Sequence, residues 1–279
     1  MSVSPFKDLE AHLEAAAAGG GVVSLWWADL DGERFARHAD APHYAASTMK
    51  LPLAIAAMRK AVRGELDLSM PVRVHNSFTS VADGSTFSVD SAEDEDPGTW
   101  AALDHGTRTV LQLADHAIAH SGNLATNLLL ELVGLDEVAK VLENAGCSAR
   151  TVVARGIEDV KAREAGITNT VTAADLGLIM SGVGRRDTAL GGPMVCGPVE
   201  AMLARQRHRN QIPAGLPSGL PIANKTGWIQ GVSHDVCLVR PIDRAPFVLS
   251  ICTTTDLHEE PAAALVASLA KDVWRIFAG

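Results

Sequence analysis

The chain has 279 residues, 47% of them hydrophobic, so it can bury a large core as one big domain or two interleaved lobes, and disorder is excluded. A formal net charge of -9, with no run of Lys and Arg, argues against nucleic acid and anionic membranes as partners. Four cysteines without a C-x-x-C pair indicate free thiols of a reducing compartment.

The N-terminal part is predicted to form a helix followed by two strands. An apolar face spans residues 4–18, and a glycine triplet ends this helix. Residues 22–28 and 34–38 are rich in strand formers and are joined by a tight turn. No segment is long enough to span a bilayer, and residues 1–14 lack an export signal. We therefore expect a cytoplasmic protein, or a secreted one if a signal has been trimmed.

The middle of the chain is predicted to be mainly helical. A polar segment, residues 75–106, carries the acidic run Asp90–Asp96, which lacks the ligand order of a calcium loop. We expect it to be a solvated surface loop or, alternatively, a segment that frames a cleft. Helices are predicted at 110–120, 123–133, 135–144, from 173 onward after the cap Thr172, and at 199–207, with 155–169 aperiodic and 190–198 a loop.

Two histidines of the first of these helices, His116 and His120, lie four residues apart on one face. Such a pair can ligate a metal, but no third ligand follows at a suitable spacing. We interpret them as ordinary surface or packed histidines, and we expect neither a metal nor a cofactor.

The C-terminal part returns to strands. Strand patterns occupy residues 222–228, 233–240 and 247–254, and Pro261 opens a final amphipathic helix. Strands at both ends around a helical middle predict an α+β fold whose single sheet is built from both ends of the chain. We expect an α/β lobe of residues 1–46 and 210–279, and a helical lobe of residues 47–209, with a cleft between them.

The first motif that carries chemistry is Ser47-Thr48-Met49-Lys50, which runs into an apolar segment. The pattern predicts a helix start, with Ser47 near the positive end of the helix dipole. Lys50 lies one turn later on the same face. A lysine that is kept dry can be neutral enough to take the proton of a serine hydroxyl. Pro52 predicts a tight or slightly kinked first turn.

The same S-x-x-K pattern occurs twice more, and both cases have a structural explanation. Ser4 precedes a proline and resembles an N-cap, and Lys7 follows in the same helix. Ser268 and Lys271 are predicted on the solvent-exposed face of the final helix. The choice of Ser47 therefore needs further motifs.

Two more motifs follow in order. Ser121-x-Asn123 is predicted on a loop between helices, and Lys225-Thr226-Gly227 on a strand; each occurs once. The trio S-x-x-K, S-x-N and K-T-G resembles the penicillin-recognising serine hydrolases, and most closely the class A β-lactamases. The resemblance spans about residues 22–277 and implies an antiparallel sheet flanked by helices, plus an all-helical lobe.

The resemblance also implies catalytic roles. Ser47 would be the nucleophile that forms an acyl-enzyme, and Lys50 would help to move its proton. Ser121 would relay a proton to the leaving nitrogen, and Asn123 would hold Lys50 and the substrate amide.

The remaining motif implies substrate binding. Lys225 and Thr226 would bind the substrate carboxylate, and Gly227 would let the strand lie close against it. The backbone N–H groups of Ser47 and Trp228 would form the oxyanion hole.

Three positions depart from the class A pattern. Gly122 stands where class A usually has Asp, and Trp228 stands where a small residue is usual. The E-x-x-L-N segment, whose glutamate holds the hydrolytic water, has no full match, because Ala162 replaces its asparagine. Glu158 is our candidate for the base, with Glu164 a second choice. The alternative is a surface carboxylate paired with Arg155 or Arg163.

The sequence thus predicts a serine hydrolase that cleaves β-lactam amides with modest or atypical turnover. The trio equally suits a D-Ala-D-Ala peptidase or an esterase, and a non-catalytic penicillin-binding sensor is the alternative of another class. The expected partner is a small β-lactam, peptide or ester substrate, and neither nucleic acid nor membrane.

Overall fold

The computed structural model describes residues 5–279, which separate into two compact units. Unit 1 comprises the chain up to Thr48, Val171–Ser181 and His208–Gly279, and unit 2 comprises Met49–Thr170 and Gly182–Arg207. The lobes expected from the sequence, with a cleft between them, stay a prediction. Ser4, the expected N-cap of the first helix, lies outside the described residues.

Unit 1 is built on a five-stranded antiparallel sheet in the order β2-β1-β11-β10-β9. Strand β1 pairs along its length with β11, from Val22 opposite Thr254 to Asp29 opposite Phe247. This pairing confirms that the sheet is assembled from both ends of the chain. The strands are β1 (Val22–Asp29), β2 (Glu33–Arg37), β9 (Ile222–Ile229), β10 (Val232–Val239) and β11 (Phe247–Thr254).

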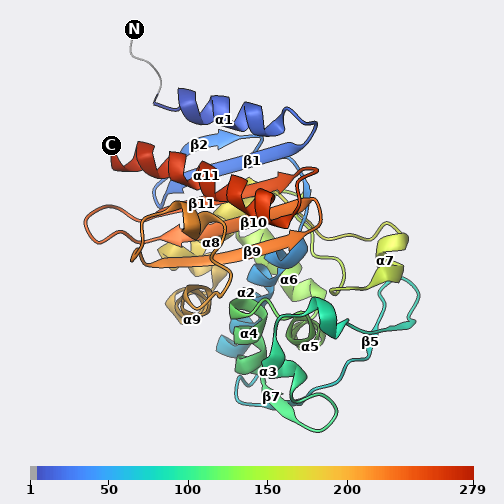
Figure 1. Cartoon of the computed structure of the whole chain (residues 1–279). Helices are drawn as coiled ribbons and strands as arrows, with labels where there is room; N and C mark the ends of the chain where they lie inside the picture. Colours follow the sequence, from blue (N-terminus) through green and yellow to red (C-terminus); the bar gives the residue numbers. More distant parts are fainter. Residues whose placement is uncertain (1–4) are drawn as a thin grey trace. The chain divides into compact units, whose positions relative to one another are not determined.

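Two terminal helices, α1 (Lys7–Ala17) and α11 (Glu259–Ala278), lie side by side over one face of this sheet (Figure 1). Leu9 and Leu13 of α1 are buried in the same apolar cluster as Trp27 of β1. Neighbouring residues of a strand point to opposite faces. Trp26 accordingly lies on the other face, where Gly177 of α8 (Ala173–Arg185) packs against its indole ring.

Unit 2 is organised around helix α2 (Lys50–Val62), which packs against four other helices. All nine residues from Lys50 to Met58 are buried, as expected of a helix that is apolar all round. Its neighbours are α4 (Val110–Ala119), α5 (Asn123–Val133), α6 (Leu135–Asn144) and α9 (Pro193–Ala204).

Short elements complete the chain. Unit 2 holds two small antiparallel pairs, β4 (Pro71–Arg73) with β7 (Thr107–Thr109) and β5 (Phe78–Thr79) with β6 (Thr86–Phe87), and the helices α3 (Pro97–Trp100) and α7 (Val160–Glu164). The others are β3 (His43–Tyr44), the 3-10 helices η1 (Ala46–Met49), η2 (Ser91–Glu93) and η3 (Thr188–Leu190), β8 (Thr170–Val171), and α10 (Ile212–Gly215).

The prediction of a loop at residues 190–198 is wrong, because α9 begins at Pro193 and continues through Pro198. Pro193 suits the first helical turn. Pro198 removes the hydrogen bond to the carbonyl of Met194, but Met194 is 72% exposed, so water can solvate that side of the helix. The aperiodic stretch 155–169 likewise contains the short helix α7, which Asp159 caps at its N-terminus.

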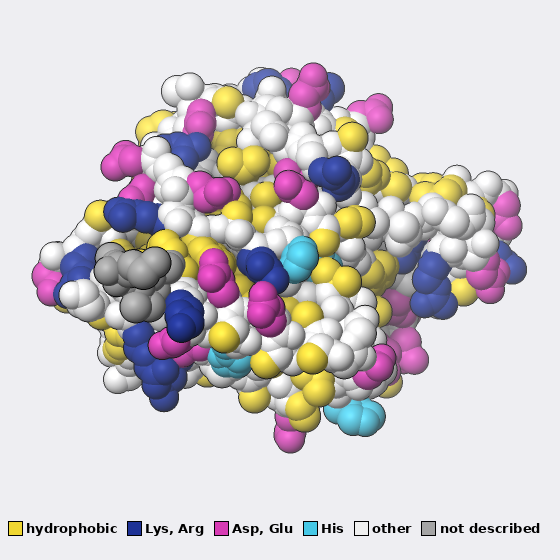
Figure 2. All heavy atoms as spheres, turned by 90° about the horizontal axis from the view of Figure 1, so that it is seen from above, with side chains coloured by type: hydrophobic (Ala, Val, Ile, Leu, Met, Phe, Trp, Pro, Cys, Tyr) yellow, Lys and Arg dark blue, Asp and Glu magenta, His cyan; other side chains and the backbone are white. Residues whose placement is uncertain are grey.

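The surface carries charges of both signs. On the face seen in Figure 2, Lys and Arg side chains lie among Asp and Glu side chains. All four cysteines are free, as expected, and three of them, Cys196, Cys237 and Cys252, are buried. Within residues 5–279, every helix is too short or too polar to cross a bilayer.

The sheet of unit 1 buries a pair of histidines whose rings lie 5.3 Å apart. His43 contacts the hydroxyls of Ser24 (2.9 Å) and Thr254 (2.8 Å), and His234 accepts from the N–H of Thr253 (3.1 Å). Burial, together with the facing His234, lowers the pKa of His43 to about 3, and burial lowers the pKa of His234 to about 4. Both rings are therefore neutral at neutral pH.

These histidines predict loss of stability in mild acid. In the unfolded chain these rings become protonated below about pH 6.5, whereas in the native protein they stay neutral down to about pH 4. Between pH 7 and pH 5, each histidine should therefore lower the unfolding free energy by up to about 2 kcal/mol. Denaturant titrations at the two pH values measure this loss. His43→Gln should reduce it and the exposed His105→Gln should not; an unchanged loss in His43→Gln would contradict the assignment.

Candidate active site

Within unit 2, the lysine of the first motif lies at the centre of a polar cluster. Lys50 is fully buried, and its Nζ donates to the carbonyl oxygen of Ser121 (2.5 Å) and to Oδ1 of Asn123 (2.8 Å). Burial lowers the pKa of Lys50 to about 7, although the carboxylates of Asp94, Glu158 and Asp96 act to raise it. Much of this amine is therefore neutral near pH 7 and can accept a proton from a hydroxyl.

The loop that carries Ser121 is held in an uncommon backbone conformation. Ser121 has φ = +59° and is 8% exposed, and the next residues begin α5. A residue with a side chain adopts this left-handed region at some cost, and such residues gather at functional sites. This conformation accompanies the bond from Lys50 to the Ser121 carbonyl.

Asn123 connects the lysine to the proposed loop base. Its Nδ2 donates to Oε1 of Glu158 (3.3 Å), while Oε2 of Glu158 accepts from the backbone N–H of Asp90 (2.7 Å). Burial raises the pKa of Glu158, which also has a positive φ of 63°. The side chains of Lys50, Asn123 and Glu158 thus form one continuous chain of polar contacts.

The alternatives weighed for Glu158 have other surroundings. Arg155 is buried and donates to the carbonyl oxygens of Ile167 (3.1 Å) and Gly156 (2.9 Å). Glu164 is largely exposed and lies 3.4 Å from Lys161. Of the two carboxylates considered from the sequence, Glu158 is the one that contacts the lysine cluster.

Two features of this cluster escaped the sequence analysis. Asn127 holds the Glu158 segment, because its Nδ2 donates to the Ile157 carbonyl and its Oδ1 accepts from the Ile157 N–H. Asn127 follows Asn123 by one helical turn, so the sequence could have indicated that the two side chains lie on the same face of the helix. The acidic run also engages the Ser121–Asn123 turn through Asp94, so the description as a solvated loop is incomplete.

The two histidines considered as a metal pair are engaged otherwise. Nδ1 of His116 lies 3.0 Å from Oδ2 of Asp96, and the rings of His116 and His120 stack with centroids 5.0 Å apart. Among residues 5–279, no three His, Cys, Asp or Glu side chains are grouped so that they could hold a metal ion.

Within unit 1, the serine lies against the K-T-G strand. Ser47 lies in η1, which runs directly into α2, and this agrees with the tight first turn expected from Pro52. A Cβ at Gly227 of β9 would lie 2.9 Å from the backbone nitrogens of both Ser47 and Thr48. The strand therefore approaches the serine backbone as closely as a glycine allows.

The other residues of this strand are buried or half-buried beside it. Lys225 is buried and its Nζ donates to the Thr226 carbonyl (2.8 Å). The buried Oγ1 of Thr226 has no hydrogen-bond partner among the described residues. The half-buried Trp228 places its ring 4.6 Å from that of His208. Thr226 thus retains bonding capacity for a ligand.

The predicted site residues therefore form two groups. Lys50, Ser121, Asn123 and Glu158 meet within unit 2. Ser47 meets the K-T-G strand within unit 1. The chain passes from one unit to the other between Thr48 and Met49, inside the first motif. That one catalytic centre uses both groups stays a prediction.

Comparisons with known proteins identify the family of the chain. The model of the β-lactamase enzyme family matches residues 5–277. β-Lactamase AST-1 from Nocardia asteroides is 30% identical over an aligned length of 172 residues. The match covers 59% of this chain and 54% of that protein, so the chain spans about half the length of this relative.

Solved structures show the same fold. A β-lactamase from Sphaerobacter thermophilus DSM 20745 superimposes with a TM-score of 0.82 at 25% identity, covering 98% of this chain and 97% of that chain. The class A β-lactamase of the last common ancestor of Gram-negative bacteria (GNCA4) has a TM-score of 0.80 at 22% identity, covering 99% and 100%. The chain belongs to the β-lactamase enzyme family and has the fold of its class A members.

Proposed function

We propose that the chain is a serine hydrolase that opens the amide bond of β-lactams through an acyl-enzyme. The observation that carries this proposal is the buried Lys50, held by Ser121 and Asn123 with a pKa of about 7. In the first step, Lys50 takes the proton of the Ser47 hydroxyl as its oxygen attacks the lactam carbonyl carbon. The carbon–nitrogen bond then breaks, and Ser121 relays the proton held by Lys50 to the leaving nitrogen.

The K-T-G strand binds and activates the substrate. Lys225 and Thr226 hold its carboxylate, and the N–H groups of Ser47 and Trp228 stabilise the oxyanion. The close approach of Gly227 to the Ser47 nitrogen supports this arrangement, because it brings the strand backbone beside one of the two donors. The Trp228 indole packs against His208 and restricts which substrates fit beside the K-T-G strand.

Glu158 acts in the second step. Its carboxylate takes a proton from a water molecule, whose oxygen attacks the ester carbonyl carbon. The bond between this carbon and the Ser47 oxygen then breaks, and the proton passes to that oxygen to restore the hydroxyl. Ala162 stands in place of the asparagine of the class A segment, so the segment whose glutamate holds that water matches only in part. We therefore propose deacylation that is slower than acylation, and modest turnover.

Replacing Gly227 by alanine tests the role of the strand. The added Cβ would lie 2.9 Å from two backbone nitrogens, so the strand or the serine backbone must shift. Because an oxyanion-hole donor typically contributes about 100 to 1000-fold in rate, we expect acylation to slow by about 100-fold. Stopped-flow acylation measures this. Gly197→Ala on α9, where a Cβ meets nothing within 4 Å, is the control; equal rates in both variants would contradict the assignment.

The proposed reaction is tested by comparing three substrates with the purified protein. We expect steady hydrolysis of a chromogenic cephalosporin that exceeds turnover of a p-nitrophenyl ester and of a D-Ala-D-Ala peptide. Faster turnover of the ester or the peptide would instead identify an esterase or a peptidase. A single burst of one equivalent without turnover would identify a penicillin-binding sensor.

A further inference from the structure

Gly122, at the centre of the turn that holds Lys50, has no side chain, and Asp96 occupies the space that a side chain would need. A Cβ at Gly122 would lie 2.8 Å from both Cβ and Oδ2 of Asp96. The Gly122 backbone, at φ = -59° and ψ = 124°, is open to any residue. Glycine is therefore required here because of Asp96, and not because of its own conformation.

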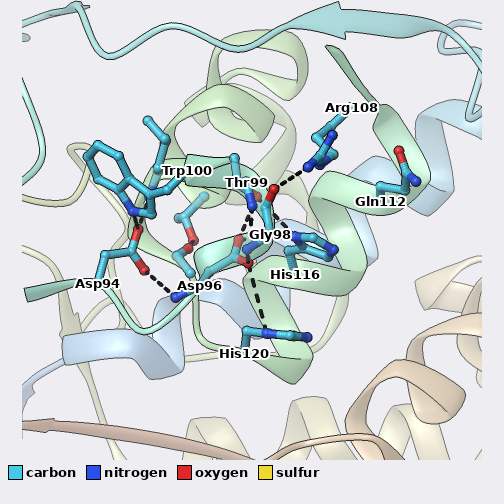
Figure 3. Close-up of polar contacts among 12 residues, drawn as sticks. Asp94, Asp96, Gly98, Thr99, Trp100, Arg108, Gln112, His116 and His120 are labelled. Atoms are coloured by element: carbon cyan, nitrogen blue, oxygen red, sulfur yellow. Dashed lines mark hydrogen bonds and ion pairs between the residues drawn. The ribbon is translucent and has the colours of Figure 1, made fainter. Parts of the chain in front are cut away.

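The carboxylate of Asp96 is held in place by several donors. It is fully buried and accepts from the N–H of Gly98 (3.1 Å), from the hydroxyl of Thr99 and from Nδ1 of His116 (3.0 Å; Figure 3). Burial would raise the pKa of Asp96, but the bonds from His116 and Thr99 lower it to about 2. Asp96 is therefore a fixed anion between α3, α4 and the Gly122 turn.

A second carboxylate from the same segment caps the helix that Gly122 leaves uncapped. The Gly122 N-cap has no side-chain bond, but the N–H groups of Asn123 and Leu124 donate to Asp94 Oδ1 (3.0 Å) and Oδ2 (2.9 Å). The indole N–H of Trp100 also donates to Asp94 (2.9 Å; Figure 3). Asp94 thus satisfies donors that a helix normally leaves to an N-cap side chain.

We propose that Asp94 and Asp96 are positioning residues that replace, from a distant segment, the side chain that Gly122 lacks. They fix the Ser121 carbonyl and the Asn123 amide, the two acceptors that hold Lys50. The inference rests on the proposed function. It implies that the fold cannot accommodate an aspartate at position 122 while Asp96 is present, because the two side chains would occupy the same space.

An exchange of the two positions tests the inference. Gly122→Asp should lower the acylation rate by at least about tenfold because its side chain meets Asp96, and Asp96→Gly should do so because the turn loses its support. Asp96→Gly also removes the obstructing Cβ, so the double variant should acylate at least about tenfold faster than either single variant. Losses that simply multiply in the double variant would overturn the inference.

A second variant separates positioning from a general loss of structure. The carboxylates that act on the Lys50 ammonium are Asp94, Asp96 and Glu158, and each raises its pKa. Asp94→Asn keeps the shape but removes the charge and one of the two acceptor oxygens, so the acid limb of the acylation pH profile should move to lower pH. Asp83→Asn, an exposed residue of the same polar segment, should leave the limb unmoved. An unmoved limb in Asp94→Asn would overturn the inference.

Intact mass spectrometry with a penicillin distinguishes failure of the inference from failure of the proposed function. A parent protein that is never acylated would refute the proposed function, and the inference with it. A parent that is acylated, while the exchange variants show no recovery, would refute the inference alone.

Discussion

Replacing Ser47 by alanine is expected to abolish acylation and to lower hydrolysis by at least about 10⁴-fold. The reason is that every later step passes through the ester formed on this hydroxyl. Intact mass spectrometry over time with a penicillin should show the parent protein gaining the mass of the drug and the variant remaining unchanged. Hydrolysis of a chromogenic cephalosporin by the same samples measures the rate.

The chain provides a matched control for this experiment in another serine of the same pattern. Ser268 also precedes a lysine by three residues, but its Oγ donates to the Leu265 carbonyl within α11 (2.8 Å). Ser268→Ala should keep full acylation. A Ser47→Ala protein that still gains drug mass would show that the nucleophile has been wrongly assigned.

Replacing Glu158 by glutamine is expected to leave acylation nearly intact and to slow deacylation by about 10² to 10⁴-fold. Glutamine keeps the size of the side chain, but it cannot take a proton from water. The acyl-enzyme should therefore accumulate and persist, whereas in the parent it should decay. The decay of the acylated mass after removal of free drug measures the rate directly.

Glu164→Gln is the control for the loop base. Its side chain is 61% exposed and pairs with Lys161, so deacylation should match that of the parent protein. If the Glu158→Gln acyl-enzyme decayed as fast as that of the parent protein, another group would have to activate the water, and our assignment would fail.

Secondary structure was predictable where local pattern decides it. The bounds of α5, α6 and β11 agree with the sequence. The apolar residues of the two helices recur with the helical period, and β11 is a short, nearly continuous run of strand formers. The first half of helix α9 was wrongly predicted as a loop because the prolines within it contradict the local rule, and the buried residues Val195, Cys196 and Val199 override that rule through tertiary packing.

The site was predictable only where its residues lie in short motifs. The neighbours of Lys50 at Ser121 and Asn123 follow from the motif pattern, whereas Asp94 and Asp96 do not. Their contacts with the Ser121–Asn123 turn join residues that are 26 or more positions apart, and no periodicity encodes such pairs. An acidic run in a polar segment is typical of solvated surface. The missing N-cap side chain that these carboxylates replace is visible in the sequence only as a glycine, Gly122.

The burial of helix α2 has a consequence for the exposure of the Lys50 amine to solvent. Lys50 begins a helix whose first nine residues are all shielded from solvent, so its amine cannot reach water through fraying of a terminal turn. Releasing the amine requires the surrounding helices to separate. The free energy of such an opening approaches that of global unfolding, and the amide protons that it exposes exchange slowest. The amine of Lys50 is thereby protected from solvent for as long as the helical unit itself remains folded.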